Sequence, residues 1–98
     1  MNQIKSPAIY VLASRRNGTL YTGVTANLSG RVWAHKQNLV AGFTQKYQVH
    51  TLVYYEMHVS MYAAIEREKQ IKAGSRADKI GLIEAINPRW CDLYSELL

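Results

Sequence analysis

Polar residues that interrupt apolar rows are the first sign of chemistry in this sequence. A helix is expected from about residue 27 to residue 38, and one row of side chains at helical spacing along it consists of Leu28, Val32, His35 and Leu39. Because that row should be buried, His35 should be buried with it. Arg31 lies one turn before His35 and points the same way. The pair is either catalytic or a core histidine with a backbone partner beside a solvated arginine.

A carboxylate breaks the apolar face of a second expected helix, which runs from a Ser60 cap to about Lys72. The residues of that face are Met61, Ala64, Ile65, Glu68 and Ile71. Burial of an unpaired charge is costly, so a buried Glu68 needs a metal ion, a cationic side chain or a proton. Alternatively, Glu68 lies at the edge of the face and pairs with Lys72 or Arg31. The neighbouring charged residues are expected on the solvated face: Glu66, Arg67 and Lys69.

A β-hairpin is expected at the start of the chain. Residues 8–14 are rich in β-branched and large apolar side chains, which predicts a strand. Asn17-Gly18 is typical of a two-residue type I′ turn, because both residues tolerate a positive φ. Residues 20–24 then form the return strand.

The register of this hairpin decides whether two tyrosines meet. A turn at residues 17–18 would place Ser14 opposite Tyr21 and Leu12 opposite Gly23. Successive side chains along a strand point to opposite faces. Tyr10 and Tyr21 should therefore look toward the same face of the sheet.

The rest of the chain supplies one more strand and two more helices. Either Asn27 or Ser29 can cap the first helix, residues 40–47 are expected to be a loop, and residues 50–56 a third strand. Residues 75–78 resemble a capping box that opens a third helix. That helix should end near Asn87, because a proline follows.

The elements and the tail together indicate one compact fold. The tail carries apolar residues that can dock on the body: Trp90, Leu93, Tyr94 and Leu97. The length fits a single domain over residues 1–98. The order β-β-α-β-α-α predicts an α/β (α+β) fold, with a small, three-stranded, mainly antiparallel sheet flanked by helices.

The charge balance points to an anionic partner. Twelve Lys and Arg against seven Asp and Glu give a formal net charge of +5. Nucleic acid is the commonest partner of such a chain, and a merely basic soluble surface is the alternative.

Several other classes of protein are excluded. The single cysteine, Cys91, cannot form an internal disulfide or a cysteine zinc site. The histidines lack zinc spacing, and the glycines lack the spacing of a nucleotide-binding loop, so no small-molecule cofactor is expected. The apolar run over residues 8–13 is too short to span a membrane, and two arginines follow it. The protein is expected to be cytoplasmic.

The ordered set of polar residues resembles that of the GIY-YIG nuclease superfamily. Ala8-Ile9-Tyr10 and Tyr21-Thr22-Gly23 are similar to the paired tripeptides of the family. Arg31 follows Tyr21 by ten residues and His35 follows Arg31 by four. The segment from Glu68 to Lys72 and the Asn87-Pro88 pair extend the match over nearly the whole chain. Small stand-alone bacterial members are the most similar, although Ala8 and Thr22 depart from the family pattern.

The resemblance implies hydrolysis of DNA phosphodiester bonds with one divalent cation, Mg²⁺ or Mn²⁺. Glu68 would be the metal ligand, because hard cations prefer carboxylate oxygen. Arg31 would stabilise charge on the phosphate. Tyr10 or Tyr21 would activate the attacking water, and the sequence does not decide which. His35 would relay a proton or hold a tyrosine.

Further residues are expected to support this site. Gly23 should let the helix or the substrate approach the sheet, and Asn87 should shape the site from the end of the third helix. Candidates for contacts to phosphates are Lys36, Lys46, Lys72, Arg76 and Lys79. A role in DNA repair or processing is expected, with RNA still open as a substrate. The alternative is a nucleic-acid-binding module with little or no cleavage. Whether the chain acts as a homodimer or with a partner protein is open.

Overall fold

The computed structural model describes residues 6–98 and contains a three-stranded antiparallel sheet. Strands β1 (Ala8–Ala13), β2 (Leu20–Thr25) and β3 (Thr51–Met57) lie in the order β2-β1-β3. The helices are α1 (Leu28–Lys36), α2 (Phe43–Tyr47), α3 (Met61–Ala73) and α4 (Arg76–Ile86), followed by a 3₁₀ helix, η1 (Leu93–Leu97). This architecture confirms the predicted fold class. No helix within residues 6–98 has the length and apolar character needed to cross a membrane.

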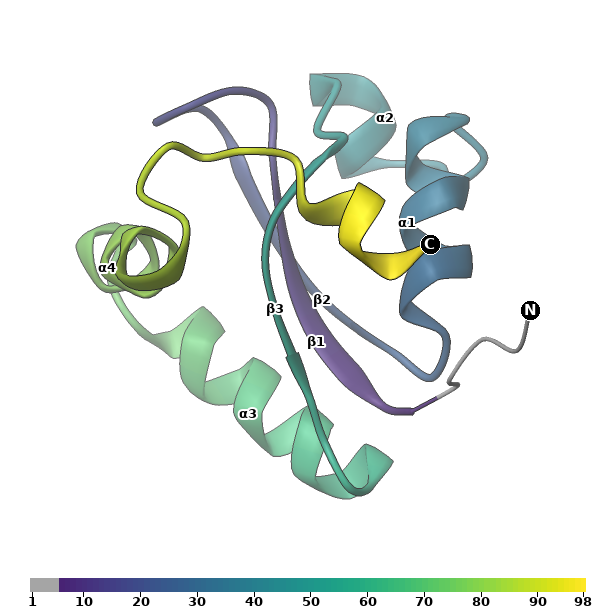
Figure 1. The fold of residues 1–98 in the computed structure, drawn as a ribbon, viewed down its shortest axis with the longest axis vertical. Helices are drawn as coiled ribbons and strands as arrows, with labels where there is room; N and C mark the ends of the chain where they lie inside the picture. The colour runs from purple at the N-terminus through teal and green to yellow at the C-terminus, as the bar shows by residue number, and fades with distance from the viewer. Residues whose placement is uncertain (1–5) are drawn as a thin grey trace.

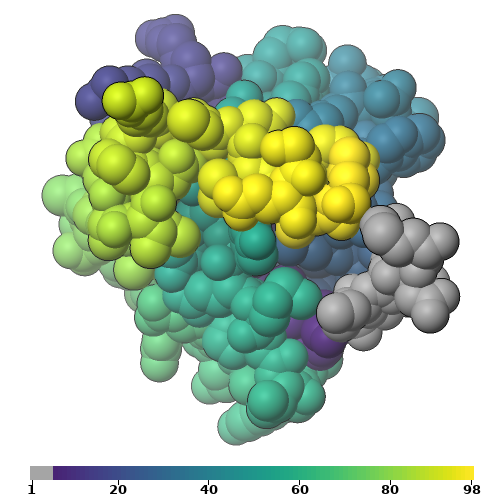
Figure 2. All heavy atoms as spheres, in the orientation of Figure 1, coloured from purple at the N-terminus to yellow at the C-terminus, as the bar shows by residue number. Residues whose placement is uncertain are grey.

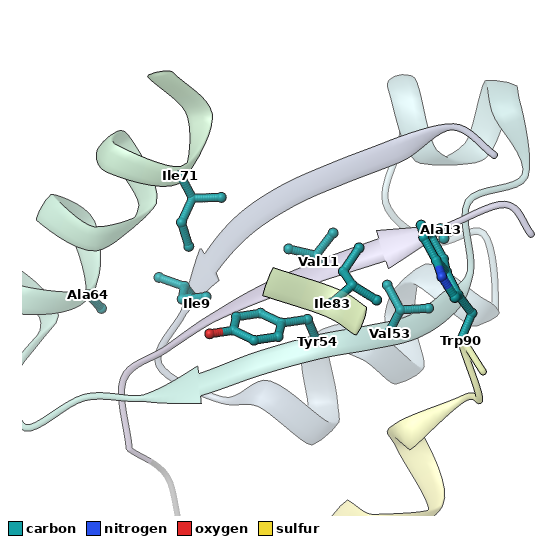
Figure 3. Close-up of a cluster of buried hydrophobic side chains, with 9 residues drawn as sticks. All are labelled: Ile9, Val11, Ala13, Val53, Tyr54, Ala64, Ile71, Ile83 and Trp90. Atoms are coloured by element: carbon teal, nitrogen blue, oxygen red, sulfur yellow. The ribbon is translucent and has the colours of Figure 1, made fainter. Parts of the chain in front are cut away.

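Helices cover both faces of the sheet, with α3 and α4 on one side and α1 and η1 on the other (Figure 1). All six residues of β1 are buried, because this strand lies in the centre of the sheet. Alternate residues of β1 therefore belong to two cores. The core on the α3–α4 side contains Ile9, Val11, Val53, Ile71 and Ile83 (Figure 3).

The second core lies on the other side of the sheet, which Tyr10 and Leu12 of β1 face. Its buried members include Tyr10, Leu12, Leu28, Val32 and Leu52. The predicted docking of the tail is divided between the two cores: Leu93, Tyr94 and Leu97 pack against this one, and Trp90 belongs to the core on the α3–α4 side. The C-terminal segment covers the surface between α4 and α1 (Figure 2).

The hairpin has the predicted faces and a different register. Leu12 lies opposite Tyr21, and Tyr10 lies opposite Gly23, two residues away from the expected pairing. The reason is a four-residue loop over residues 15–18, in which Asn17 has a positive φ and Gly18 does not, so a type I′ turn cannot form. A shift of two residues preserves the alternation of side chains. Tyr10 and Tyr21 consequently still share one face.

Three local predictions are wrong. Leu39 is 65% exposed, because α1 ends at Lys36 and the chain turns away at Asn38, where φ is 57°. The segment expected to be a loop over residues 40–47 contains the short helix α2. Arg67 is not a solvated residue: its Nε and Nη2 atoms donate to the Glu56 carboxylate at 3.0 Å each.

The caps of the longer helices follow the sequence closely. The Asn27 side chain accepts from the Gly30 amide at the start of α1. Ser60 caps α3, and Ser75 and Asp78 form the predicted capping box of α4. These caps satisfy amide groups that the first turn of a helix leaves without partners.

Candidate active site

Three rings from three elements meet on the α1 face of the sheet. Tyr10 comes from the central strand, Tyr21 from β2 and His35 from α1. The centroid of the Tyr10 ring lies 6.2 Å from that of Tyr21 and 5.8 Å from that of His35. The Tyr21 and His35 centroids are 5.6 Å apart. Tyr10 and Tyr21 meet because their side chains point to the same side of two adjacent strands, and α1 brings His35 next to both.

His35 connects two buried hydroxyl groups. Its Nε2 atom lies 3.0 Å from the Tyr10 hydroxyl, and its Nδ1 atom lies 2.8 Å from the hydroxyl of Thr44 on α2. Burial, assisted by the positive charge of Arg31, lowers the pKa of His35 to about 4. The imidazole is therefore neutral near pH 7, with one nitrogen donating and the other accepting. His35 is therefore a buried core histidine and Arg31 is exposed, as one of the two alternatives had it, but the partners of His35 are side-chain hydroxyls and not a backbone group.

The burial of His35 predicts a pH-dependent stability. The folded state holds the pKa of His35 near 4, whereas an unfolded histidine has a pKa of 6.5, so unfolding takes up a proton at low pH. The native state should lose about 3 kcal/mol of unfolding free energy from this residue as the pH falls from 7 through 4, and the loss should level off below the folded pKa. Urea unfolding at several pH values measures this loss.

A non-titrating variant isolates the histidine. In His35→Gln the carboxylates are unchanged, so their contribution to acid sensitivity cancels in the comparison. The difference in stability between the wild-type protein and the variant should shrink as the pH falls from 6.5 to 4. A difference that is constant over this range would contradict a depressed pKa.

Tyr10 is the most buried hydroxyl of the cluster, with 1% of its surface exposed. Burial raises the pKa of Tyr10 to about 12, and the nearby Arg31 guanidinium opposes this rise. The negative charge of Glu68 adds to it. Arg31 and Glu68 thus act on the same hydroxyl from α1 and α3. At neutral pH the resting Tyr10 is a phenol and needs additional positive charge to become a phenolate.

Glu68 lies at the border of this cluster and is paired. Its Oε2 atom is 3.1 Å from Lys72 Nζ, one of the two pairings that the sequence left open. The Glu68 side chain is 15% exposed, whereas that of Lys72 is 53% exposed and can move away. Within residues 6–98 no three His, Cys, Asp or Glu side chains come together as a ready-made metal site. A single accessible carboxylate fits Mg²⁺, which keeps several waters when it binds protein.

The absence of a side chain at Gly23 makes room for the catalytic tyrosine candidate. A Cβ atom at this position would lie 2.5 Å from both Cζ and the hydroxyl oxygen of Tyr10. The sequence predicted that a helix or the substrate would use this space, but the ring of Tyr10, from the neighbouring strand, occupies it. The ring of Tyr10 crosses directly over Gly23, its partner on β2.

We expect Gly23→Ala to displace Tyr10 and reduce activity strongly. Overpacking of this kind costs about 1–3 kcal/mol, and here the group that must move carries the hydroxyl bonded to His35. Thermal melting and DNA cleavage measure the two effects. Gly81→Ala on α4 is the matched control, because a Cβ there meets nothing within 4 Å and alanine favours a helix by about 0.5–1 kcal/mol. Full activity in Gly23→Ala would contradict the role given to Tyr10.

Three of the five basic residues predicted to contact phosphates lie at or near a surface hollow beside Tyr21 and Phe43. Lys72 and Lys79 line a surface hollow of about 360 Å³ together with Leu20, Tyr21, Thr22 and Phe43. Lys46 on α2 lies over the ring of Tyr47, 5.3 Å from its centroid. Lys72 also pairs with Glu68, and Lys79 Nζ donates to the backbone oxygen of Gly74 at 2.8 Å.

Two other candidates for phosphate contacts have partners within the protein. Arg76 Nη2 donates to the backbone oxygens of Asn17 at 2.8 Å and Gly18 at 2.7 Å, which ties α4 to the hairpin loop. Lys36 Nζ donates to the Asp92 carboxylate and to the backbone oxygen of His50. Lys36 therefore holds the C-terminal segment rather than facing the ring cluster.

Asn87 does not join the cluster. Its side-chain nitrogen donates to the backbone oxygens of Val53 at 3.1 Å and Cys91 at 2.8 Å, and its oxygen accepts from the Cys91 amide. These contacts lie at β3, whereas Tyr21 lies on β2, at the opposite edge of the sheet. The expected role of Asn87 in shaping the site is replaced by one in joining α4, β3 and the tail.

Thr44 and Phe43 are part of the site and were not expected from the sequence. Thr44 is 2% exposed and orients His35, while Phe43 stacks on Tyr21. Both lie in the segment expected to be a loop, and their contacts cross between elements. No helical or strand spacing links them to the residues they touch.

The chain is similar to known proteins over most of its length. Residues 6–80 match the model of the GIY-YIG catalytic domain. A UPF0213 protein of Staphylococcus haemolyticus is 37% identical over 76 residues, which cover 78% of this chain and 92% of the relative. A UPF0213 protein of Syntrophus aciditrophicus is 38% identical over 77 residues, which cover 78% of this chain and 87% of the relative.

A solved structure extends the likeness to three dimensions. The NMR structure of a UPF0213 protein of Bacillus halodurans superposes with a TM-score of 0.52 at 26% identity, covering 83% of this chain and 85% of that one. The matched domain and these three relatives place this chain in a superfamily of nucleases. The chain belongs to the GIY-YIG family.

Proposed function

We propose that this protein is a metal-dependent endonuclease that hydrolyses phosphodiester bonds in DNA during repair or processing. The observation that carries the proposal is the arrangement around the Tyr10 hydroxyl. This hydroxyl is hydrogen-bonded to His35 at 3.0 Å, and Arg31 and Glu68 are both close enough to act on its pKa. A buried phenol with a neutral partner and nearby opposite charges is typical of acid–base catalysis.

Tyr10 is the general base in this proposal. Once added positive charge has lowered its raised pKa, Tyr10 loses its own proton to solvent, and the phenolate oxygen then takes a proton from the attacking water. Arg31 supplies part of that charge. Tyr21 lines the hollow, and its ring is tilted against that of His35 with no hydrogen bond to the imidazole, so Tyr21 serves as a wall that orients Tyr10 and the substrate.

His35 holds Tyr10 rather than relaying its proton. With a pKa of about 4, His35 is a poor proton acceptor at neutral pH. If Thr44 donates its hydroxyl hydrogen to Nδ1, Nε2 carries the proton and donates to the Tyr10 oxygen. That arrangement stabilises a phenolate and fixes the ring of Tyr10.

Arg31 and Glu68 act on the phosphate. Arg31 is exposed, and its planar guanidinium can donate to two non-bridging oxygens as charge builds on them. Glu68 would hold the divalent cation, in exchange for its pairing with Lys72. When bound, the cation stabilises negative charge on the phosphate and on the leaving oxygen.

The pairing of Glu68 with Lys72 also supports a second candidate. An acid already neutralised by a lysine at 3.1 Å, on a chain with a net charge of +5, fits a nucleic-acid-binding module without cleavage. The two candidates differ in what a metal ion does. Binding to phosphates weakens with salt in both, whereas only the nuclease converts its substrate.

The test is cleavage by the purified wild-type chain. Supercoiled plasmid, linear duplex, nicked and branched DNA, single strands and RNA are each incubated with Mg²⁺, with Mn²⁺ and with chelator. The nuclease proposal expects nicks that need the metal ion and disappear with chelator. Salt-sensitive binding with every substrate intact would favour the binding module instead.

A further inference from the structure

A row of aromatic rings leads from the buried cluster to the surface. The ring of Tyr21 stacks on that of Phe43, with centroids 6.1 Å apart and planes inclined by 29°. Phe43 in turn packs on Tyr47 at 4.8 Å. Phe43 is 45% exposed and Tyr47 is 47% exposed. Both belong to α2, whose buried residue is Thr44, the partner of His35.

Positive charge accompanies these exposed rings. Lys46 lies over the Tyr47 ring, and Lys72 and Lys79 share the hollow of about 360 Å³ with Tyr21 and Phe43. None of the residues that line this hollow is acidic. Its size falls within the range of sites for small molecules, about 300–1,000 Å³. A ligand that fits must present a flat apolar face and negative charge together.

We propose that α2 and this hollow bind an unpaired nucleotide of the substrate next to the reacting phosphate. The base stacks on the rings of Phe43 and Tyr47, while Lys46, Lys72 and Lys79 contact the neighbouring phosphates. The inference rests on the proposed nuclease function for the identity of the ligand. It deepens that function, because it names single strands, loops and frayed ends as the preferred substrates.

The geometry of a duplex explains this preference. A base inside a duplex stacks on neighbours on both faces, so its flat surface is not available to a protein ring. An unpaired base offers that surface, and stacking on aromatic side chains tolerates every base. Phe43 has no hydrogen-bonding group with which to distinguish bases. We therefore expect selectivity for unpaired structure with little selectivity for sequence.

Fluorescence of 2-aminopurine tests the stacking directly, since this base is quenched when it stacks. A single strand, a hairpin loop and a continuous duplex, each with one 2-aminopurine, are titrated with the full-length protein in chelator, so that no cleavage intervenes. Binding of the single strand and the loop should be tighter than binding of the duplex and accompanied by quenching.

Variants assign the stacking to α2. Phe43→Leu and Tyr47→Leu should each weaken binding of the single strand about tenfold and abolish quenching, while affinity for the continuous duplex stays within twofold. Phe43→Trp keeps an aromatic ring and should retain both the affinity and the quenching. Tyr62→Leu, on α3, removes an aromatic ring that is 76% exposed and should change nothing. Circular dichroism melting establishes that each variant is folded.

The outcomes separate this inference from the proposed function. Equal binding of single strand and duplex, or full quenching in Phe43→Leu, overturns the proposed binding of an unpaired base by α2 even where metal-dependent cleavage is present. Quenching that needs Phe43 supports this binding even where no cleavage is found. In that case the nuclease proposal fails and the binding of an unpaired base stands. Dimers that form without DNA and are lost in Phe43→Leu would assign the rings to a second copy of this chain and overturn the inference.

Discussion

Tyr10→Phe is expected to lower the rate of DNA cleavage by about 10²–10⁴-fold, the usual contribution of a general base. The change removes one oxygen and leaves a ring that can still cross over Gly23. It also leaves His35 Nε2 without its partner at 3.0 Å, which should cost about 1–3 kcal/mol of stability. Single-turnover cleavage at saturating protein measures the chemical step, and thermal melting measures the stability.

Tyr21→Phe and Tyr62→Phe are the controls for this result. Tyr21 contributes its ring to the cluster, and the loss of its hydroxyl should reduce cleavage less than the loss of the Tyr10 hydroxyl. Tyr62 is exposed on α3, so its variant should retain wild-type activity. A larger loss in Tyr21→Phe than in Tyr10→Phe would make Tyr21 the base.

Glu68→Gln should reduce metal-dependent cleavage by at least about 10²-fold, because the charge that would hold the cation is gone. The amide keeps the size of the side chain, so the fold should be retained. Affinity for DNA should stay the same or rise, since removal of Glu68 frees Lys72 to contact phosphate. Cleavage is measured over a range of Mg²⁺ and Mn²⁺ concentrations, and binding is measured in chelator.

Glu66→Gln is the matched control on the same helix. Glu66 is 49% exposed and pairs with Lys69 at 3.4 Å, in the same way that Glu68 pairs with Lys72. Its variant should cleave like the wild-type protein at every metal concentration. Equal losses in the two variants would mean that the general charge of α3 matters, rather than the position of Glu68.

The sequence was sufficient to predict which side of the sheet each side chain of the hairpin faces, but not which residues of its two strands lie opposite each other. Alternation along residues 8–14 and 20–24 places Tyr10 and Tyr21 on one side for any even shift of register. The true pairing depends on the loop over residues 15–18, which is closed by a hydrogen bond from the Gly18 amide to the Arg15 carbonyl and in which Gly18 does not use the positive φ open to glycine. The contact of Gly23 with Tyr10 follows from the register, so the sequence predicted room for a helix or the substrate at Gly23 instead.

The burial of His35 could be predicted, and its partners could not. Residues four apart in a helix always lie close together, so the spacing within α1 shows which of its side chains share a face. The contact with Thr44 spans nine residues and a change of chain direction. The helix α2 has five residues, too few for a periodic pattern, so nothing in the sequence marked it.

The charged residues of α3 show the same limit. Helical spacing placed Glu68 within the apolar face and left open whether it lies at the edge and pairs with Lys72 or Arg31; the structure has the pairing with Lys72. It could not reveal that Arg67 turns toward Glu56 at the end of β3. Pairs between elements depend on how a helix is docked on the sheet, which spacing along one element does not contain.

The position of a bound divalent cation tests the central claim most directly. Mn²⁺ is paramagnetic and broadens the NMR signals of nearby nuclei, so a titration of the labelled full-length protein locates it. The account predicts broadening at Glu68, Tyr10 and Tyr21, sharp signals at Asn87 across the sheet, and loss of the effect in Glu68→Gln but not in Glu66→Gln. Broadening that spares Glu68 and Tyr10, or that is unchanged in Glu68→Gln, would contradict a metal-dependent site at this cluster.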